Sequence, residues 1–206
     1  MACTCPLILM GFIYGQDDHY FINDLEIEGN ESISKNEILF IVRQRPPNFF
    51  FRRPKFDPRL LRLDALTLKN YYYSKGFLDV VINESYHIKD NSNKNKFVDI
   101  LYKVVEGKQY HLSKVHINGN DLISKKKITK ILGLKIDSPY NPVGLNDNLY
   151  LLENEYHNLG KLFATITLKD EIKDSVEIKI DIDEGKYIYI NNTRIEKKGN
   201  IDSAIV

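Results

Sequence analysis

The five histidines are the side chains best suited to acid–base or metal chemistry, but their spacing supports neither. His111 and His116 are the closest pair, and their odd separation along a predicted strand sends the two rings to opposite faces, so they cannot share a metal ion. The chain also lacks a nucleophile elbow, a phosphate-binding glycine loop and an H-E-x-x-H motif. We therefore expect a protein that is not an enzyme and that uses no cofactor or metal. The remaining histidines, His19, His87 and His157, stand alone.

A cationic segment between residues 43 and 62 is the strongest candidate for a binding surface. It contains one acid, Asp57, and its cations are interleaved with phenylalanines. Anionic lipid headgroups or an acidic partner would fit this chemistry, whereas a nucleic acid would need phosphate contacts combined with stacking. The favoured structural interpretation is a solvated loop whose phenylalanines join the core. The candidate contacts to lipid or a partner are Arg52, Arg53, Lys55 and Arg59.

The composition limits the classes of protein to which the chain can belong. With 43% hydrophobic and 28% charged residues in 206, it is globular and large enough for one ordinary domain or two small ones. Its 29 Lys and Arg balance 28 Asp and Glu, so bulk attraction to nucleic acid is not expected. The only cysteines, Cys3 and Cys5, stand together near the start, which excludes a disulfide scaffold.

Residues 6–14 form an apolar run (PLILMGFIY) that precedes the polar residues 16–18. This pattern is typical of a secretory signal peptide, and we expect one over residues 1–16. The alternative is an ordinary buried N-terminal segment, because no Lys or Arg precedes the run. No apolar run reaches the roughly 18 residues that a membrane-spanning helix requires.

An internal repeat determines the expected architecture. Apolar, glycine and turn positions of residues 25–42 recur at 115–132, those of 57–76 at 141–160, and those of 98–104 at 176–182. The offset falls from 90 to 84 to 78, so the first copy carries two additional loop segments, around residues 46–53 and 90–96. We expect one unit over residues 20–107, a second over 108–186, and the first strand of an incomplete third unit over 187–206.

Each copy predicts the element order β-α-α-β-β. Ser34, followed three residues later by Glu37, has the spacing of a capping box at the start of a short helix. Asp57-Pro58 places a cap residue before a proline, which favours the start of a second helix. Residues 176–182 alternate between apolar and charged side chains, as a strand does when one sheet face is buried. The expected fold is α+β, with tandem units of a three-stranded sheet that carries two helices on one face.

The order of these motifs resembles that of the POTRA (polypeptide-transport-associated) domain. The motifs that carry the resemblance in the first copy are residues 25–30 (LEIEGN), Asp64, Leu68, Tyr72, residues 76–77 (GF) and residues 104–107 (VVEG). The second copy repeats most of them between residues 115 and 185, with Asn148 in place of Asp64. The run from residue 55 to residue 76 is most similar to the middle domains of a BamA-type array.

The resemblance implies a periplasmic binding scaffold of the BamA/TamA-type outer-membrane assembly superfamily. It implies binding of unfolded outer-membrane proteins or accessory subunits of an assembly complex by strand addition at a sheet edge. It also implies a place at the periplasmic face of the outer membrane as part of a longer barrel protein, or in the periplasm if the chain is complete. The family places the second strand of each unit at the edge, here over residues 78–84 and 162–169. The predicted client-binding residues are Leu78, Val80, Ile82, Leu162, Ala164, Ile166 and Leu168.

Three alternatives to this function remain open. A two-partner-secretion or a divisome-type scaffold would also use POTRA units, although the divisome type has a single unit and a membrane anchor. A KH-like RNA-binding module also packs helices on a three-stranded sheet, but it requires G-x-x-G between two helices. No G-x-x-G occurs in the chain, so nucleic acid is not an expected partner, whereas an anionic membrane surface is.

Overall fold

The structure is a computed structural model that describes residues 19–47, 54–89, 95–189 and 192. Contacts divide the chain into two compact units, of which the first contains residues up to 69 together with 80–106. The second contains residues 70–79 together with those from 107 onward. The expected signal peptide and most of the expected third strand lie outside the described residues, and residues 187–189 belong to no strand.

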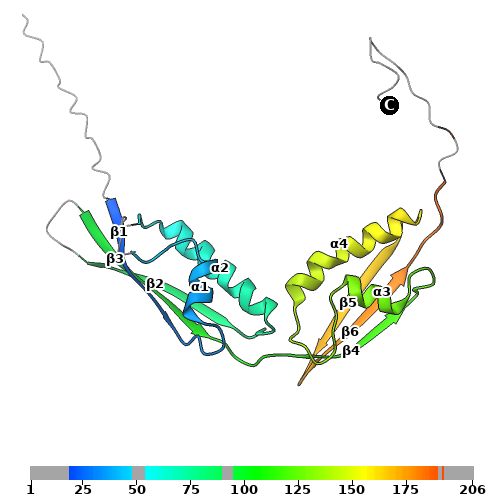
Figure 1. Cartoon of the computed structure of the whole chain (residues 1–206), viewed down its shortest axis with the longest axis horizontal. Helices are drawn as coiled ribbons and strands as arrows, with labels where there is room; N and C mark the ends of the chain where they lie inside the picture. The colour runs from blue at the N-terminus through cyan, green and yellow to red at the C-terminus, as the bar shows by residue number, and fades with distance from the viewer. Residues whose placement is uncertain (1–18, 48–53, 90–94, 190–191, 193–206) are drawn as a thin grey trace, which may run out of the picture. The chain divides into compact units, whose positions relative to one another are not determined.

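The first unit consists of one three-stranded sheet and two helices (Figure 1). The strand order is β1-β3-β2, with β1 parallel and β2 antiparallel to the central β3. Both helices lie on the same face of the sheet, and β2 forms one of its edges (Figure 1). The elements are β1 (His19–Glu28), α1 (Lys35–Ile41), α2 (Pro58–Ser74), β2 (Val81–Lys89) and β3 (Asn95–Val105).

The second unit repeats this arrangement with strand order β4-β6-β5. Here β4 is parallel and β5 antiparallel to the central β6, and β5 forms an edge. The predicted α+β fold, with two helices on one face of a three-stranded sheet in each unit, is therefore confirmed. The elements are β4 (Leu112–Asn118), α3 (Lys125–Ile131), α4 (Pro142–Asn158), β5 (Thr165–Ile172) and β6 (Val176–Asp183).

Capping side chains set the starts of the helices where the sequence predicts them. The hydroxyl oxygen of Ser34 accepts a hydrogen bond from Glu37 N at 3.3 Å and so caps α1. At the start of α4, Asn141 Oδ1 accepts from Gly144 N at 2.8 Å. Each of these bonds satisfies one backbone N–H that the first turn of a helix cannot pair internally.

A glycine ends the first strand of each unit because the chain passes too close to the central strand for a side chain. Gly29 has φ 76°, and a Cβ there would lie 2.1 Å from Val104 O. Gly119 has φ 74°, and its Cβ would lie 2.0 Å from Ile182 O. Only glycine tolerates both this backbone conformation and this approach.

The alternating pattern of the central strands buries one sheet face against the helices in each unit. In the first unit α2 contributes Leu61, Ala65 and Leu68, all of them buried and spaced along one face of the helix. In the second unit α4 contributes Leu145 and Leu152 to the core. The central strands contribute Val98, Ile100, Tyr102 and Val104 in β3, and Val176, Ile178, Ile180 and Ile182 in β6.

The edge strands begin and end later than the sequence predicts. The expected strand over residues 78–84 is observed at Val81–Lys89, and the expected strand over 162–169 is observed at Thr165–Ile172. The cause is a turn after each second helix, which delays the pairing. Phe77 N donates to Tyr72 O at 3.1 Å, and Ala164 N donates to Lys161 O at 3.1 Å.

Candidate functional site

The outer sides of β2 and β5 are open backbone edges. β2 pairs with β3 from Val81↔Val105 to Lys89↔Phe97, and β5 pairs with β6 over its whole length. Among the described residues, no backbone hydrogen bond from outside the sheet reaches either strand. Alternate N–H and C=O groups along each strand therefore point away from the sheet.

The opposite edges, formed by β1 and β4, are partly covered by the chain itself. In the first unit the segment before α2 runs beside β1, and Ile22 N donates to Pro54 O at 2.8 Å. In the second unit the equivalent segment runs beside β4, and Leu112 N donates to Ser138 O at 3.0 Å. This connection covers the start of the first strand in both units, whereas the second strand is open along its whole length in the described part of the chain.

Side chains of the two edge strands alternate between the helix side of the sheet and its open side. Ile82 lies opposite the buried Val104 and Ile166 lies opposite the buried Ile182, so these residues share the helix side with every second neighbour. The resulting helix-side rows are Ile82, Glu84, Tyr86 and Ile88 in β2, and Ile166, Leu168, Asp170 and Ile172 in β5.

The equivalent residues Tyr86 and Asp170, in the middle of the two rows, make different side-chain contacts. In the first unit the rings of Phe56 and Tyr86 are 4.8 Å apart, and Tyr86 remains 47% exposed. In the second unit Tyr140 OH donates to Asp170 Oδ2 at 3.1 Å. Burial, and then the neighbouring charge of Asp170, raise the pKa of Tyr140 above its ordinary value, so this hydroxyl remains a donor into the alkaline range.

The structure places three of the seven predicted client-binding residues in the edge strands, namely Ile82, Ile166 and Leu168. Val80 is 2% exposed and precedes β2, so it presents nothing to a partner. Ala164 and the exposed Leu162 precede β5, and the N–H of Ala164 is already donated to Lys161 O. Leu78 also precedes β2 and is partly buried.

Sequence reasoning missed Glu84, Tyr86 and Asp170 as site residues. The signal was present, because these residues continue the period-two pattern of Ile82 and Ile166 along the same face. It was overlooked because Tyr86 and Asp170 lie beyond the ends of the expected strands and because only apolar residues were selected within them.

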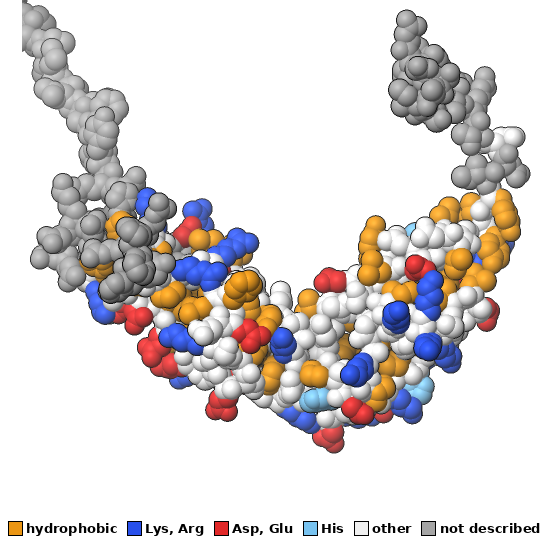
Figure 2. Space-filling view, viewed as in Figure 1, with side chains coloured by type: hydrophobic (Ala, Val, Ile, Leu, Met, Phe, Trp, Pro, Cys, Tyr) orange, Lys and Arg blue, Asp and Glu red, His pale blue; other side chains and the backbone are white. Residues whose placement is uncertain are grey.

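The cationic segment is only partly described. Arg52 and Arg53 lie outside the described residues, and Lys55 is exposed where its backbone bridges to Phe21 of β1. Arg59 is also exposed, and its guanidinium contacts the Asp57 carboxylate, with Nε 3.3 Å from Oδ1. Figure 2 shows cationic side chains interleaved with hydrophobic ones over the helices of the first unit.

A shallow apolar depression accompanies these cations on the outer face of α2. It is lined by Pro58, Arg59, Arg62, Leu63 and Leu66, whose spacing places them along one side of the helix. Leu63 and Leu66 are exposed, so this side of α2 combines apolar surface with positive charge.

A buried polar cluster lies behind the β2 edge. Asp64 of α2 accepts hydrogen bonds from Arg43 N at 2.8 Å and Gln44 N at 2.9 Å, which ties the segment after α1 to α2. Tyr102 OH lies 3.5 Å from Asp64 Oδ2. Burial, and then the charges of Asp64 and Glu84, raise the pKa of Tyr102. Both carboxylates therefore act on one buried hydroxyl.

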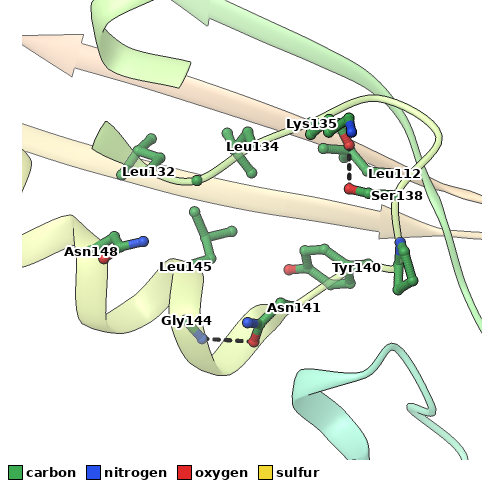
Figure 3. Close-up of a pocket in the computed structure, with 12 residues that line it drawn as sticks. Leu112, Leu132, Leu134, Lys135, Ser138, Tyr140, Asn141, Gly144, Leu145 and Asn148 are labelled. Atoms are coloured by element: carbon green, nitrogen blue, oxygen red, sulfur yellow. Dashed lines mark hydrogen bonds between the residues drawn. The ribbon is translucent and has the colours of Figure 1, made fainter. Parts of the chain in front are cut away.

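The second unit has a cavity of about 120 Å³ in the corresponding region (Figure 3). Leu145 projects from α4 toward Leu132 and Leu134, and Asn148 lies one turn further along the helix (Figure 3). Leu134 and Asn148 stand where the first unit has Gln44 and Asp64. The lining is mixed, without a convergent set of polar groups that would specify a ligand.

The described residues contain no group of three or more His, Cys, Asp or Glu side chains placed to hold a metal ion. Within the same part of the chain, no helix is both long and apolar enough to cross a membrane.

Comparison with known proteins identifies the class to which this fold belongs. The sequence profile of POTRA, described as surface antigen variable number repeat, matches residues 20–107 and 110–185. The chain therefore belongs to the POTRA family and contains two tandem copies of its domain.

Its relatives and structural neighbours include BamA-type assembly factors. Outer membrane protein assembly factor BamA of Buchnera aphidicola is 26% identical over 189 residues, which cover 87% of this chain and 29% of the relative. BamA of Neisseria meningitidis serogroup B is 24% identical over 181 residues, covering 84% and 22%. The crystal structure of Haemophilus influenzae BamA POTRA3-5 matches with a TM-score of 0.57 at 19% identity, covering 91% of this chain and 75% of that one, which shows the shared fold. The chain spans less than a third of these curated relatives.

Proposed function

We propose that this chain is the client-binding, non-catalytic part of an outer-membrane protein assembly factor, acting at the periplasmic face of the outer membrane. Its partners would be unfolded segments of outer-membrane proteins or accessory subunits of the assembly complex, added as strands to β2 and β5. One observation carries the proposal: the chain covers the β1 and β4 edges in part but leaves β2 and β5 uncovered. Similarity to BamA supplies the biological setting.

Strand addition suits a partner that varies in sequence. The main-chain groups of an extended peptide pair with an open edge whatever its side chains are, and every second side chain then meets the helix-side row. The tandem units would offer two such edges on one chain, and two linked sites raise the effective concentration of a client that reaches both.

Titration of the chain with an extended peptide from an outer-membrane protein strand, followed by NMR, tests this function. We expect amide shifts confined to residues 81–89 and 165–172 and their neighbours on the central strands. Shifts centred on β1 and β4, or no shifts at millimolar peptide, would contradict strand addition at the proposed edges.

Proline substitutions provide a sharper test of the backbone role. Adjacent N–H groups on an edge strand point in opposite directions, so of Ser85→Pro and Tyr86→Pro one removes an outward donor and the other removes a bond to β3. We expect the outward variant to keep the fold and lose peptide binding. Thr165→Ser, which keeps every backbone group of β5, is the matched control and should bind as before.

A contact with an anionic membrane surface is a second proposed function, carried by the outer face of α2. Arg59 and Arg62 flank the exposed Leu63 and Leu66, the combination that a helix uses when it lies on anionic lipid. Co-sedimentation with anionic vesicles should weaken with added salt and with Arg59→Glu combined with Arg62→Glu. Lys114→Glu, at an exposed lysine of β4, is the control, and binding that survives the α2 substitutions would exclude this face.

A further inference from the structure

The β2 edge carries an acidic side chain in an otherwise apolar row. Glu84 lies on the helix side of the sheet, directly opposite the fully buried Tyr102, and is itself half-buried. Its neighbours along the row are Ile82 on one side and Tyr86 on the other. A carboxylate in this position loses part of its hydration without leaving the edge of the sheet.

Glu84 has no counterion among the described residues of its unit. In the part of the chain that the structure describes, no hydrogen bond or ion pair engages its carboxylate, although Lys89 on the open side of the same strand is paired with Asp99. A second carboxylate, that of Asp64, also acts on Tyr102. The region behind the edge is therefore negative and has a half-buried acceptor to offer an incoming group.

The second unit shows that this acid is not a requirement of the fold. Leu168 stands at the position of Glu84, opposite Ile180 in place of Tyr102. The acid of the β5 row, Asp170, lies one row position further along and already accepts the hydrogen bond of Tyr140 OH. The two edges thus differ in where they carry a charge and in whether that charge has a partner.

We propose that the β2 edge selects an extended segment that places a Lys or Arg beside Glu84 within a row of alternate apolar side chains, and that β5 does not share this preference. The inference rests on the proposed strand addition and names the class of client that the first edge prefers. Side chains directly opposite each other on paired strands approach within about 4.5–5.5 Å at Cβ, so a client cation reaches the carboxylate without distorting the strand.

The neighbours of Glu84 fit the remainder of such a client. Ile82 and Ile88 would pack on apolar residues placed two and four positions from the cation, and Ile88 is 40% exposed at present. The half-exposed ring of Tyr86 would cover the aliphatic stem of the cation and offer its face to the charge. An acidic residue at the same client position would meet Glu84 directly and be rejected.

The test uses three extended peptides with alternating apolar residues that differ only at the central helix-side position, which is Lys, Leu or Glu. Binding to the whole chain is measured separately at each edge from the amide shifts of residues 81–89 and 165–172. At low salt we expect the Lys peptide to bind β2 roughly three- to tenfold more tightly than the Leu peptide, and the Glu peptide to bind more weakly than both. At β5 the Lys peptide should have no such advantage.

Exchange of the two equivalent residues provides the matched variants. Glu84→Gln keeps the size of the side chain and should abolish the preference for Lys at β2, and Glu84→Leu should make β2 resemble β5. Leu168→Glu should confer the preference on β5. Should this last variant disturb the partly buried row, the peptide series on the Glu84→Gln protein still decides the question.

Equal affinity of the Lys and Leu peptides for β2 would overturn the inference while leaving strand addition intact. Binding of the Lys peptide that is unchanged by Glu84→Gln would overturn it in the same way. Absence of any shift at residues 81–89 with all three peptides would instead overturn the proposed function, and this inference with it.

Discussion

The two units share one fold, but the backbone N–H groups that follow the first helix of each unit bind different hydrogen-bond acceptors. In the first unit the carboxylate of Asp64 accepts the N–H groups of Arg43 and Gln44. In the second unit the equivalent N–H groups return to the first helix, where Gly133 N donates to Lys130 O at 3.2 Å and Leu134 N donates to Thr129 O at 2.9 Å. A buried side chain thus satisfies these N–H groups in the first unit, whereas carbonyl groups of the helix satisfy them through a glycine turn in the second.

This difference extends to the core and to the edge. The first unit places Gln44, Asp64, Glu84 and Tyr102 where the second places Leu134, Asn148, Leu168 and Ile180. One copy therefore has a polar cluster behind its open strand, and the other has apolar residues at three of these four positions and a small cavity. A few glycines and apolar positions therefore fix the backbone of the repeat, whereas the side-chain chemistry behind the edge differs between the copies.

The largest expected effects should be equal in the two units. Leu68→Ala and Leu152→Ala each truncate a fully buried helix residue, and each should lower the free energy of unfolding of its own unit by about 2–5 kcal/mol. Urea unfolding monitored by residue-resolved signals from each unit measures the effect. Leu66→Ala, at an exposed position, is the control, and a loss below about 1 kcal/mol at Leu152 would show that the two cores are not equivalent.

Removal of the Asp64 carboxylate should destabilise the first unit more than removal of the equivalent Asn148 amide destabilises the second. Asp64→Ala leaves the N–H groups of Arg43 and Gln44 without a partner and should cost about 2–4 kcal/mol. Asn148→Ala should cost less than about 1 kcal/mol, because the second unit pairs the equivalent groups with its own helix. The same urea experiment measures both variants. Equal losses of stability would show that the two units do not differ in how they pair the N–H groups after the first helix.

The converse substitution tests the glycine turn. Gly133 has φ 67°, so Gly133→Ala forces a Cβ into the left-handed region and should cost about 1–2 kcal/mol in the second unit. Arg43→Ala, at the equivalent position of the first unit, should stay within about 0.5 kcal/mol, since its backbone N–H remains. Hydrogen exchange of the Leu134 amide should be faster in the Gly133→Ala variant than in the parent protein, and unchanged in the Arg43→Ala variant.

The smallest expected effect is a loss of stability of the first unit at alkaline pH, caused by the buried hydroxyl of Tyr102. The pKa of Tyr102 is raised in the folded state, so its stabilising contribution is complete below the unfolded pKa near 10 and is lost as the pH rises above it. At pH 10.5 the loss attributable to this one group should be about 1 kcal/mol. Comparison of urea midpoints between pH 8 and 10.5 for the parent and Tyr102→Phe measures it, and identical pH slopes would exclude the effect.

Much of the fold could be predicted from the sequence because its signals are local. The caps at Ser34 and Asn141, the glycines at 29 and 119 and the alternation along β6 each act within a few residues. The starts of the edge strands could not be predicted, since they depend on turns such as the one in which Ala164 N returns to Lys161 O. This turn and its counterpart after α2 leave four of the seven predicted client residues before the edge strands, two in each unit.

The repeat, the order of its elements and the face that each strand buries could be inferred from sequence alone, because they follow from periodicities of two and 3.6 residues. The partial cover of the first-strand edges could not, because the hydrogen bond from Ile22 N to Pro54 O joins segments whose proximity the pattern does not encode. The folded chain also shows that Glu84 faces a buried tyrosine with no counterion among the described residues, while Asp170 accepts the hydrogen bond of a hydroxyl. The physical reason is that a charge is neutralised by whatever lies next to it in space, and long-range packing alone selects that neighbour.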